Sequence, residues 1–241
     1  MAKLSVNVNK IATLRNSRGG GTPDLMTFVG HILGFGAQGI TVHPRADCRH
    51  ITPEDARAVA RGVKTVETNF EGDVRESFLD LVLECKPTQC TLVPVQPGEV
   101  TSNHGWAVSH WAYLLAPVVA RLKEEGIRIS LFVEPGDVGS VRAAASIGAD
   151  RIEIYTEPYA TAFDRDDPEA ELDRVLRSAE AAEQCGLQVN AGHDLTHLNL
   201  PLLVRRVPNL AEVSIGHHLI SHALLVGMEQ SVHDYLTAAQ G

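Results

Sequence analysis

Short runs of apolar and β-branched residues alternate along the chain with longer stretches of helical periodicity. Most of these runs are nearly continuous in their apolar character, as expected for strands that helices cover. We predict eight strands, at residues 4–8, 39–42, 66–70, 90–94, 128–133, 151–155, 187–190 and 212–215.

The helical stretches between these strands carry recognisable start and stop signals. The sequence Thr-Pro-Glu-Asp at 52–55 predicts a capped helix start with Pro at the first helical position. Thr-Pro-Asp at 22–24 predicts the same arrangement for the helix that follows it. Gly186 is expected to end a helix over 167–185, because Gly adopts the conformation of a C-terminal cap at no steric cost.

Two longer helical stretches complete the pattern. A helix over 106–125 is expected to kink or split at Pro117, and one helix over 221–239 is expected to close the chain. Eight strand–helix units predict a single domain, residues 1–241, folded as a (β/α)8 TIM barrel of the α/β class. An open doubly wound sheet is the alternative, but the glycines at 19–21 lack the Gly-x-Gly-x-x-Gly spacing of its usual first turn.

Composition restricts the class of protein further. The chain is 44% hydrophobic and has a formal net charge of −9, which disfavours a nucleic-acid-binding protein, because such proteins need clustered positive charge. No apolar run reaches the length of a membrane span, and the N-terminal residues lack the apolar segment of a signal peptide, so we expect a cytoplasmic protein. The four cysteines show no zinc-ligand spacing and are expected to be buried or incidental thiols.

Polar and titratable residues gather where the predicted strands end. In a (β/α)8 barrel these points meet at one mouth, and the loops after the strands carry the chemistry. We therefore predict the functional site among the strand-end residues, which are Asn7, Asn9, Lys10, Arg18, His43, Arg45, Glu71, Thr101, Glu134, Glu153, Glu157, His193, Gly216 and His217.

A cationic cluster follows the second predicted strand. Arg45, Arg49 and His50 are suited, together with Arg18, to bind anionic groups, because a planar guanidinium makes paired hydrogen bonds to phosphate. Gly216, before a helix start, resembles the phosphate site that barrels often build after strands seven and eight. Alternatively, Arg49 is only a surface residue and His50 only fixes the turn before the next helix. The pattern favours a barrel enzyme that acts on small phosphorylated molecules.

Three titratable residues and one potential metal motif need separate interpretation. His43, Glu71 and His193 each end a strand, where a buried ionisable side chain is costly unless it serves a purpose. His193 and His197 have the spacing of a helical zinc motif, but they follow a strand, so we expect no metal. The other candidates have structural alternatives, as ion-pair partners or as surface or core residues: Glu134, Glu157, His218 and His222.

Seven segments resemble one known family, in order and over essentially the whole chain. They are NVNKIATLRNSRGG, GITVHPRADCRHI, NFEGD, PTQCTLVP with EVTSN, RIEIYTEPYA, VNAGHDL and VSIGHHLI. These segments resemble the pyridoxine 5′-phosphate synthase family. The resemblance implies a (β/α)8 barrel that forms homo-oligomers, octamers in the family, and that needs no cofactor. It also implies condensation of 1-deoxy-D-xylulose 5-phosphate with 3-amino-2-oxopropyl phosphate to pyridoxine 5′-phosphate, with release of inorganic phosphate and water.

The resemblance assigns a role to each motif residue. By this resemblance His43 and Glu71 would be general bases, His193 the general acid and Glu153 a carboxylate that stabilises the transition state. The aminoketone phosphate would be bound by Asn7, Arg18 and the backbone of Asp194, Gly216 and His217. The deoxyxylulose phosphate would be bound by Asn9, Lys10, Arg45, His50 and Thr101.

This chain departs from the family pattern at two places. Many members have Asp-His where this chain has Asn9-Lys10, and many have Gly at the position of Asp194. The first departure concerns sugar-phosphate binding, and the second concerns a close approach of substrate to the backbone. Two rival functions stay open: a class I aldolase or sugar-phosphate isomerase with Lys10 as Schiff-base nucleophile, and a catalytically silent sensor of a phosphorylated ligand.

Overall fold

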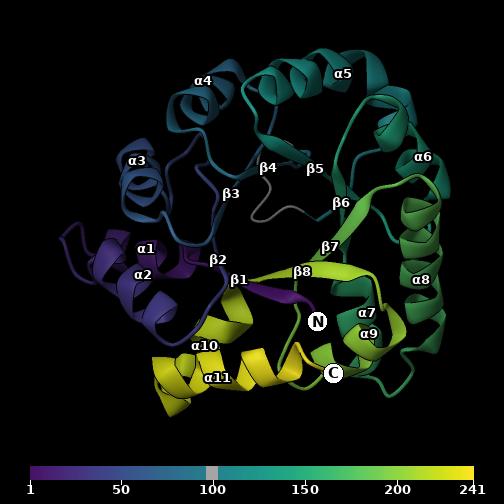
Figure 1. The fold of residues 1–241 in the computed structure, drawn as a ribbon. Helices are drawn as coiled ribbons and strands as arrows, with labels where there is room; N and C mark the ends of the chain where they lie inside the picture. Colours follow the sequence, from purple (N-terminus) through teal and green to yellow (C-terminus); the bar gives the residue numbers. More distant parts are fainter. Residues whose placement is uncertain (96–102) are drawn as a thin grey trace.

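Eight parallel strands form a closed ring at the centre of the molecule, and helices surround it (Figure 1). The computed structural model describes residues 1–95 and 103–241. The strands are β1 (Lys3–Asn7), β2 (Gly39–Val42), β3 (Glu67–Gly72), β4 (Gln89–Leu92), β5 (Arg128–Val133), β6 (Arg151–Tyr155), β7 (Gln188–Gly192) and β8 (Leu210–Ile215). They pair in chain order, and β1 closes the ring against β8, where Ser5 lies opposite Ser214. The prediction of a (β/α)8 barrel is confirmed.

The helices form an outer layer around the ring of strands (Figure 1). They are α1 (Asn9–Asn16), α2 (Leu25–Gly34), α3 (Pro53–Gly62), α4 (Glu76–Cys85), α5 (Val108–Glu124), α6 (Val138–Ser146), α7 (Glu157–Phe163), α8 (Glu169–Gln184), α9 (Leu200–Arg206), α10 (His217–Val226) and α11 (Met228–Ala238). Within the described residues, no helix has the length and apolar character needed to cross a bilayer.

The predicted helix starts are right in one case and shifted in the other. Thr52 and Asp55 form a reciprocal capping box at the start of α3, with Pro53 at the first helical position, as predicted. At α2 the cap is Asp24, whose carboxylate accepts a hydrogen bond from the backbone N–H of Thr27 at 2.8 Å. Pro23 therefore lies before the cap and not in the helix, which corrects the prediction.

The structure bears on two predictions for the long helices. Pro117 lies inside α5, which is continuous from Val108 to Glu124, so the helix is not split there. The closing stretch is two helices, α10 and α11, because Gly227 between them has φ +88°, which a right-handed helix cannot contain. Gly186, with φ +74°, directly follows the C-cap of α8, as predicted.

Side chains of the strands alternate between an apolar outer face and a polar interior. Leu4 and Val6 of β1 belong to the main hydrophobic core, which fills the space between the strands and the helices. The intervening Ser5 makes a hydrogen bond inside the barrel, as does Asn7. A separate apolar cluster, Val93, Phe132 and Tyr155, lies at one side of the mouth. The interior is thus largely polar, whereas barrel interiors are usually filled by branched apolar side chains.

Candidate active site

A cavity of about 480 Å³ opens at the carboxyl ends of the strands. Most of the predicted site residues line it: Asn7, Asn9, Lys10, His43, Arg45, His50, Glu71, Glu153, His193, Asp194, Gly216 and His217. Arg49 also lines the cavity, so it is not merely a surface residue. Arg18 is exposed in the turn after α1 and does not line it, and Thr101 lies outside the described residues.

Glu71 is a buried carboxyl at the end of β3. Its Oε2 accepts a hydrogen bond from Asn7 Nδ2 at 3.3 Å, and its Oε1 accepts one from the Ser214 hydroxyl at 3.3 Å. His43 Nδ1 lies 3.9 Å from Oε2. Burial raises the pKa of Glu71 to about 7, against the smaller opposing effect of the Ser214 hydrogen bond. Glu71 can therefore exchange a proton near neutral pH.

His43, the residue after β2, has its Nδ1 toward Glu71. Its Nε2 is buried and has no hydrogen-bond partner among the described residues, while its backbone N–H donates to Asn9 Oδ1 at 3.0 Å. Burial first, and then electrostatic repulsion by protonated His50 and by Arg45, hold the pKa of His43 well below its ordinary value. His43 is thus a neutral imidazole at neutral pH, able to accept a proton.

Glu153 is the second buried carboxyl of the mouth and projects from β6. A side chain at Gly192 on the neighbouring β7 would place its Cβ 2.5 Å from Glu153 Oε1, so it would displace the carboxyl group of Glu153. Oε2 of Glu153 has no hydrogen-bond partner among the described residues. Burial first, and then the charge of Glu71, raises the pKa of Glu153 well above its ordinary value, which leaves it a neutral carboxylic acid.

His193 follows β7 and is held between two aromatic rings. Its ring centroid lies 4.9 Å from that of Phe132 and 5.3 Å from that of Tyr155. His193 and Asp194 have positive φ angles of 82° and 56°, an uncommon conformation for residues other than Gly. The Thr156 hydroxyl holds this turn, since it lies 2.6 Å and 2.7 Å from the carbonyl oxygens of residues 192 and 193. The backbone around His193 is therefore fixed by contacts from α7's cap.

The cationic loop after β2 is organised by hydrogen bonds. His50 Nδ1 accepts a hydrogen bond from the backbone N–H of Ile51 at 2.9 Å, which assigns the proton of the neutral ring to Nε2. Burial, followed by the charge of Arg45, lowers the pKa of His50 to about 4. Asn16 donates from Nδ2 to the carbonyl of His50 at 2.7 Å. His50 therefore both fixes the turn, as the structural alternative proposed, and lines the cavity.

A helix N-terminus forms the opposite side of the cavity. Gly216 precedes α10, and a Cβ at Gly216 would lie 3.0 Å from the Cβ of Asn7. The absence of a side chain thus lets β8 approach β1 and leaves the first N–H groups of α10 accessible from the mouth. Such N–H groups favour an anion. Lys10, exposed at the start of α1, also lines the cavity.

Two other strand-end carboxylates have local partners. Glu134 Oε1 accepts a hydrogen bond from the backbone N–H of Gly105 at 2.7 Å, and Glu157 Oε1 accepts one from the Thr161 hydroxyl at 2.9 Å. Neither carboxylate forms an ion pair with a Lys or Arg side chain of the described residues, so the ion-pair alternative is wrong for the part of the chain that the structure describes. Likewise, residues 1–95 and 103–241 contain no group of three or more His, Cys, Asp or Glu placed to hold a metal ion.

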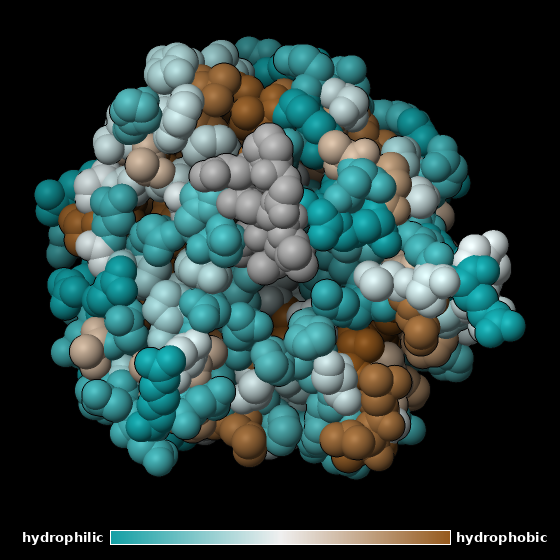
Figure 2. All heavy atoms as spheres, turned by 180° about the vertical axis from the view of Figure 1, so that it is seen from behind, coloured by the Kyte–Doolittle hydropathy of each residue, from teal (hydrophilic) through white to brown (hydrophobic). Residues whose placement is uncertain are grey.

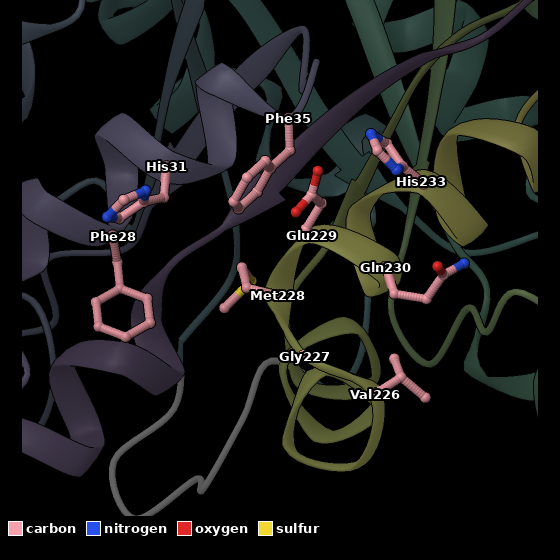
Figure 3. A pocket seen from close by; sticks show the side chains of 9 residues that line it. All are labelled: Phe28, His31, Phe35, Val226, Gly227, Met228, Glu229, Gln230 and His233. Atoms are coloured by element: carbon pink, nitrogen blue, oxygen red, sulfur yellow. The ribbon is translucent and has the colours of Figure 1, made fainter.

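A larger cavity of about 570 Å³ lies elsewhere, on the outside of the helix layer between α2 and α11 (Figure 3). Its lining mixes apolar and titratable side chains: Phe28, His31, Phe35, Val226, Gly227, Met228, Glu229, Gln230 and His233. None of these residues ends a strand, so this cavity lacks the convergent acid–base set of the barrel mouth. The mouth is therefore the candidate active site.

The chain matches the model of the family described as pyridoxal phosphate biosynthesis protein PdxJ over residues 4–241. It belongs to the PdxJ family. The pyridoxine 5′-phosphate synthase of Brucella abortus is 50% identical over 100% of this chain and 99% of the relative. That of Flavobacterium johnsoniae is 47% identical over 98% of each chain. Among solved structures, 3-keto-L-gulonate-6-phosphate decarboxylase from Vibrio cholerae superposes with a TM-score of 0.69. The match covers 99% of this chain and 97% of that one. Because the sequences are only 8% identical, it shows a shared fold alone.

The two departures of this PdxJ-family chain have clear structural settings. Asn9 Oδ1 accepts a hydrogen bond from the backbone N–H of His43. This contact needs an acceptor oxygen but no negative charge. Asp194 occupies a left-handed conformation, which Asp tolerates better than most residues and which Gly adopts freely. Its carboxylate is 3.2 Å from His218 Nε2, so the added negative charge has a partner.

Two further residues of the PdxJ-family site, Ser214 and Asn16, were missed by sequence reasoning, and Thr156 was noted only as a strand-end polar residue without a role. Ser214 is an inward-facing residue of β8, and the strand alternation alone could have placed it in the barrel interior. Asn16 and Thr156 act on loop carbonyls that belong to distant segments. No spacing signal in the sequence links them to those loops.

Proposed function

We propose that the protein condenses 1-deoxy-D-xylulose 5-phosphate with 3-amino-2-oxopropyl phosphate to pyridoxine 5′-phosphate, releasing inorganic phosphate and water. The observation that carries this proposal is the 47–50% identity, along nearly the full length, to pyridoxine 5′-phosphate synthases. The cavity supports it, because two buried carboxyls and two imidazoles converge beside groups suited to bind phosphate.

Glu71 and His43 act as general bases. The amine of the aminoketone attacks the ketone of the other substrate, and the resulting imine must lose a proton from an adjacent carbon. With a pKa of about 7, Glu71 is partly ionised at neutral pH and is basic enough to take that proton. The substrate supplies the amine, so Lys10 has no need to form a Schiff base.

His193 acts as the general acid for loss of phosphate and water. Burial lowers the pKa of His193, but a phosphate dianion bound beside the ring would raise it, because negative charge favours the imidazolium. Glu153, kept neutral by burial and by the charge of Glu71, donates a hydrogen bond to the oxyanion that develops during ring closure.

Two phosphate sites lie on opposite sides of these groups. Asn7, with the backbone of Asp194, Gly216 and His217, binds the aminoketone phosphate at the N-terminus of α10. The deoxyxylulose phosphate binds on the side of the cationic loop, at Asn9, Lys10, Arg45, His50 and Thr101. Arg18 completes the first site only if the turn after α1 moves toward the mouth. This arrangement holds the two reacting carbons in one cavity, which makes ring closure a matter of positioning.

The experiment mixes the purified protein with both substrates and follows pyridoxine 5′-phosphate by mass spectrometry. Product from the wild type that vanishes in His43→Ala and Glu71→Ala supports the proposal. No product from folded wild type would contradict it. In that case, borohydride trapping with a ketose phosphate, read at Lys10, would identify the aldolase; binding without turnover would identify the sensor.

We also propose that the single-domain chain works as a cytoplasmic homo-oligomer, an octamer by family resemblance. Apolar side chains gather on the lower rim of Figure 2, over the region where Figure 1 places α10 and α11. Leu224 and Leu225 of α10 are 78% and 85% exposed, which favours their burial against another subunit. Light scattering of the purified protein tests this part: a monomer would contradict it.

A further inference from the structure

A row of three hydroxyls crosses the barrel interior beneath Glu71. Ser214 Oγ of β8 lies 3.3 Å from Glu71 Oε1 and 3.2 Å from Thr41 Oγ1 of β2. Thr41 Oγ1 lies 2.8 Å from Ser5 Oγ of β1. All three residues are buried, with exposed fractions of 7%, 0% and 2% for Ser214, Thr41 and Ser5. The row therefore connects the carboxyl to three adjacent strands, with Ser214 at the mouth cavity and Thr41 and Ser5 deeper in the barrel.

The hydrogen bonds between Glu71, Ser214, Thr41 and Ser5 can run in two opposite directions. When Glu71 is ionised, Ser214 donates to it, Thr41 donates to Ser214, and Ser5 donates to Thr41. When Glu71 is protonated, it donates to Ser214, and each hydroxyl turns to donate to the next. Hydroxyl hydrogens rotate freely between such partners, so the reversal requires no movement of heavy atoms. An apolar side chain or an amide at these positions would allow at most one of the two states.

We infer that Ser214, Thr41 and Ser5 form a reversible hydroxyl chain that keeps Glu71 in one position through both of its protonation states. The three are positioning residues that act through Glu71. The inference rests on the proposed function, because it assumes that Glu71 gains and loses a proton in each cycle. If the carboxyl group of Glu71 does not move, its surroundings do not have to rearrange during proton transfer, which lowers the free-energy cost of that step.

The hydroxyl chain predicts that substitutions of Ser214 and of Thr41 shift the pKa of Glu71 in opposite directions. In Ser214→Ala, ionised Glu71 loses a donor, so its titration moves to higher pH by about one unit. In Thr41→Val, Ser214 can still donate to ionised Glu71. It then has no acceptor for its own proton when Glu71 is protonated, so the titration moves to lower pH by about half a unit. Thr41→Ser keeps the hydroxyl and should restore the wild-type value.

The titratable groups close to Glu71 within the described residues are His43, the residue after β2, Glu153 of β6 and Cys90 of β4. None of them changes in these variants. Ser130→Ala is the matched control, because Ser130 is a buried strand hydroxyl with no hydrogen-bond partner in the part of the chain described. Its removal should leave the titration of Glu71 unchanged.

The measurement is the infrared titration of the Glu71 carboxyl, assigned by difference against Glu71→Gln, together with the pH profile of kcat/KM. Ser214→Ala is expected to lose about fivefold in kcat/KM at pH 7 and to recover at alkaline pH. If Ser214→Ala and Thr41→Val shift the titration midpoint of Glu71 in the same direction, or if neither shifts it, the proposed hydroxyl chain is wrong. The infrared titration needs no turnover, so it tests the chain even if the wild type makes no product and the proposed function fails.

Discussion

The barrel interior holds buried carboxyls at both ends, but their surroundings differ. At the base, Arg151 Nη1 lies 3.5 Å from Glu212 Oε2, and Arg128 Nη2 lies 2.9 Å from Glu67 Oε1. Despite its burial, the pKa of Glu67 is lowered by its hydrogen bond with Glu212 and by the charge of Arg128. At the base, a guanidinium thus compensates the charge of Glu67, but Glu212 keeps a pKa raised to about 8 by burial and by its hydrogen bond with Glu67.

The mouth leaves its carboxyls without such compensation. Glu71 and Glu153 form no ion pair with a Lys or Arg side chain of the described residues, and the donors that reach Glu71 are the neutral Asn7 and Ser214. Burial therefore raises the pKa of both carboxyls. The comparison teaches that a neighbouring cation alone does not separate the two ends. Glu212 keeps a raised pKa beside Arg151, whereas Glu71 combines a raised pKa with a place in the mouth cavity.

The largest expected effect separates the two ends by activity. Glu71→Gln should lower kcat about 10³-fold, because it removes a general base. Glu212→Gln should leave kcat within about threefold, since Glu212, with its pKa raised to about 8 by burial and by its hydrogen bond with Glu67, is already mostly protonated at neutral pH. Steady-state kinetics on the two variants tests this prediction. Equal losses of kcat would show that the mouth and base carboxyls do not differ in function.

A second substitution separates the two ends by stability. Arg151→Met removes the cation that bonds Gln89, Asn190 and Glu212, and should lower the free energy of unfolding by about 3 kcal/mol. The folded fraction should keep its kcat, because Arg151 does not line the mouth cavity. Urea unfolding gives the stability. An unchanged midpoint, or a stable but inactive variant, would count against the structural role of the base.

The titration of Glu71 should make the free energy of unfolding depend on pH. Its folded-state pKa, about 7, is raised above the ordinary 4.5, so the folded protein binds this proton more tightly than the unfolded chain. That contribution is complete below pH 4.5 and is lost as the pH rises through 7. As the pH rises from 4.5 to 7, Glu71→Gln should therefore gain about 3 kcal/mol of stability relative to wild type. Thermal melts of both proteins at several pH values test this, and a constant difference would refute it.

The smallest expected effect concerns the rim of the mouth. Asp194→Gly relieves the left-handed backbone but loses the contact with His218, so stability should change by less than about 1 kcal/mol. Removing a negative charge beside the N-terminus of α10 should lower the KM for the aminoketone phosphate by about threefold. A rise in this KM would show that the Asp194 carboxylate assists binding.

The fold could be predicted because the outward faces of the strands repeat apolar residues, as in Leu4 and Val6, and because strand ends converge in a barrel. The hydroxyl chain could not, because Ser214 and Thr41 meet across 173 residues of sequence. Isolated Ser and Thr residues in strands carry no signal of such a partner. The break at Gly227 escaped prediction because a Gly within a helical pattern is often tolerated.

The most direct test of the account is the pH profile of kcat/KM for pyridoxine 5′-phosphate formation by the wild type. An uncompensated Glu71 predicts an acidic limb with a midpoint near its pKa of about 7, and this limb should be absent from the residual activity of Glu71→Gln. A midpoint near 4.5, the ordinary pKa of a glutamate, would contradict the claim that Glu71 is a base because it is buried without a neighbouring Lys or Arg side chain.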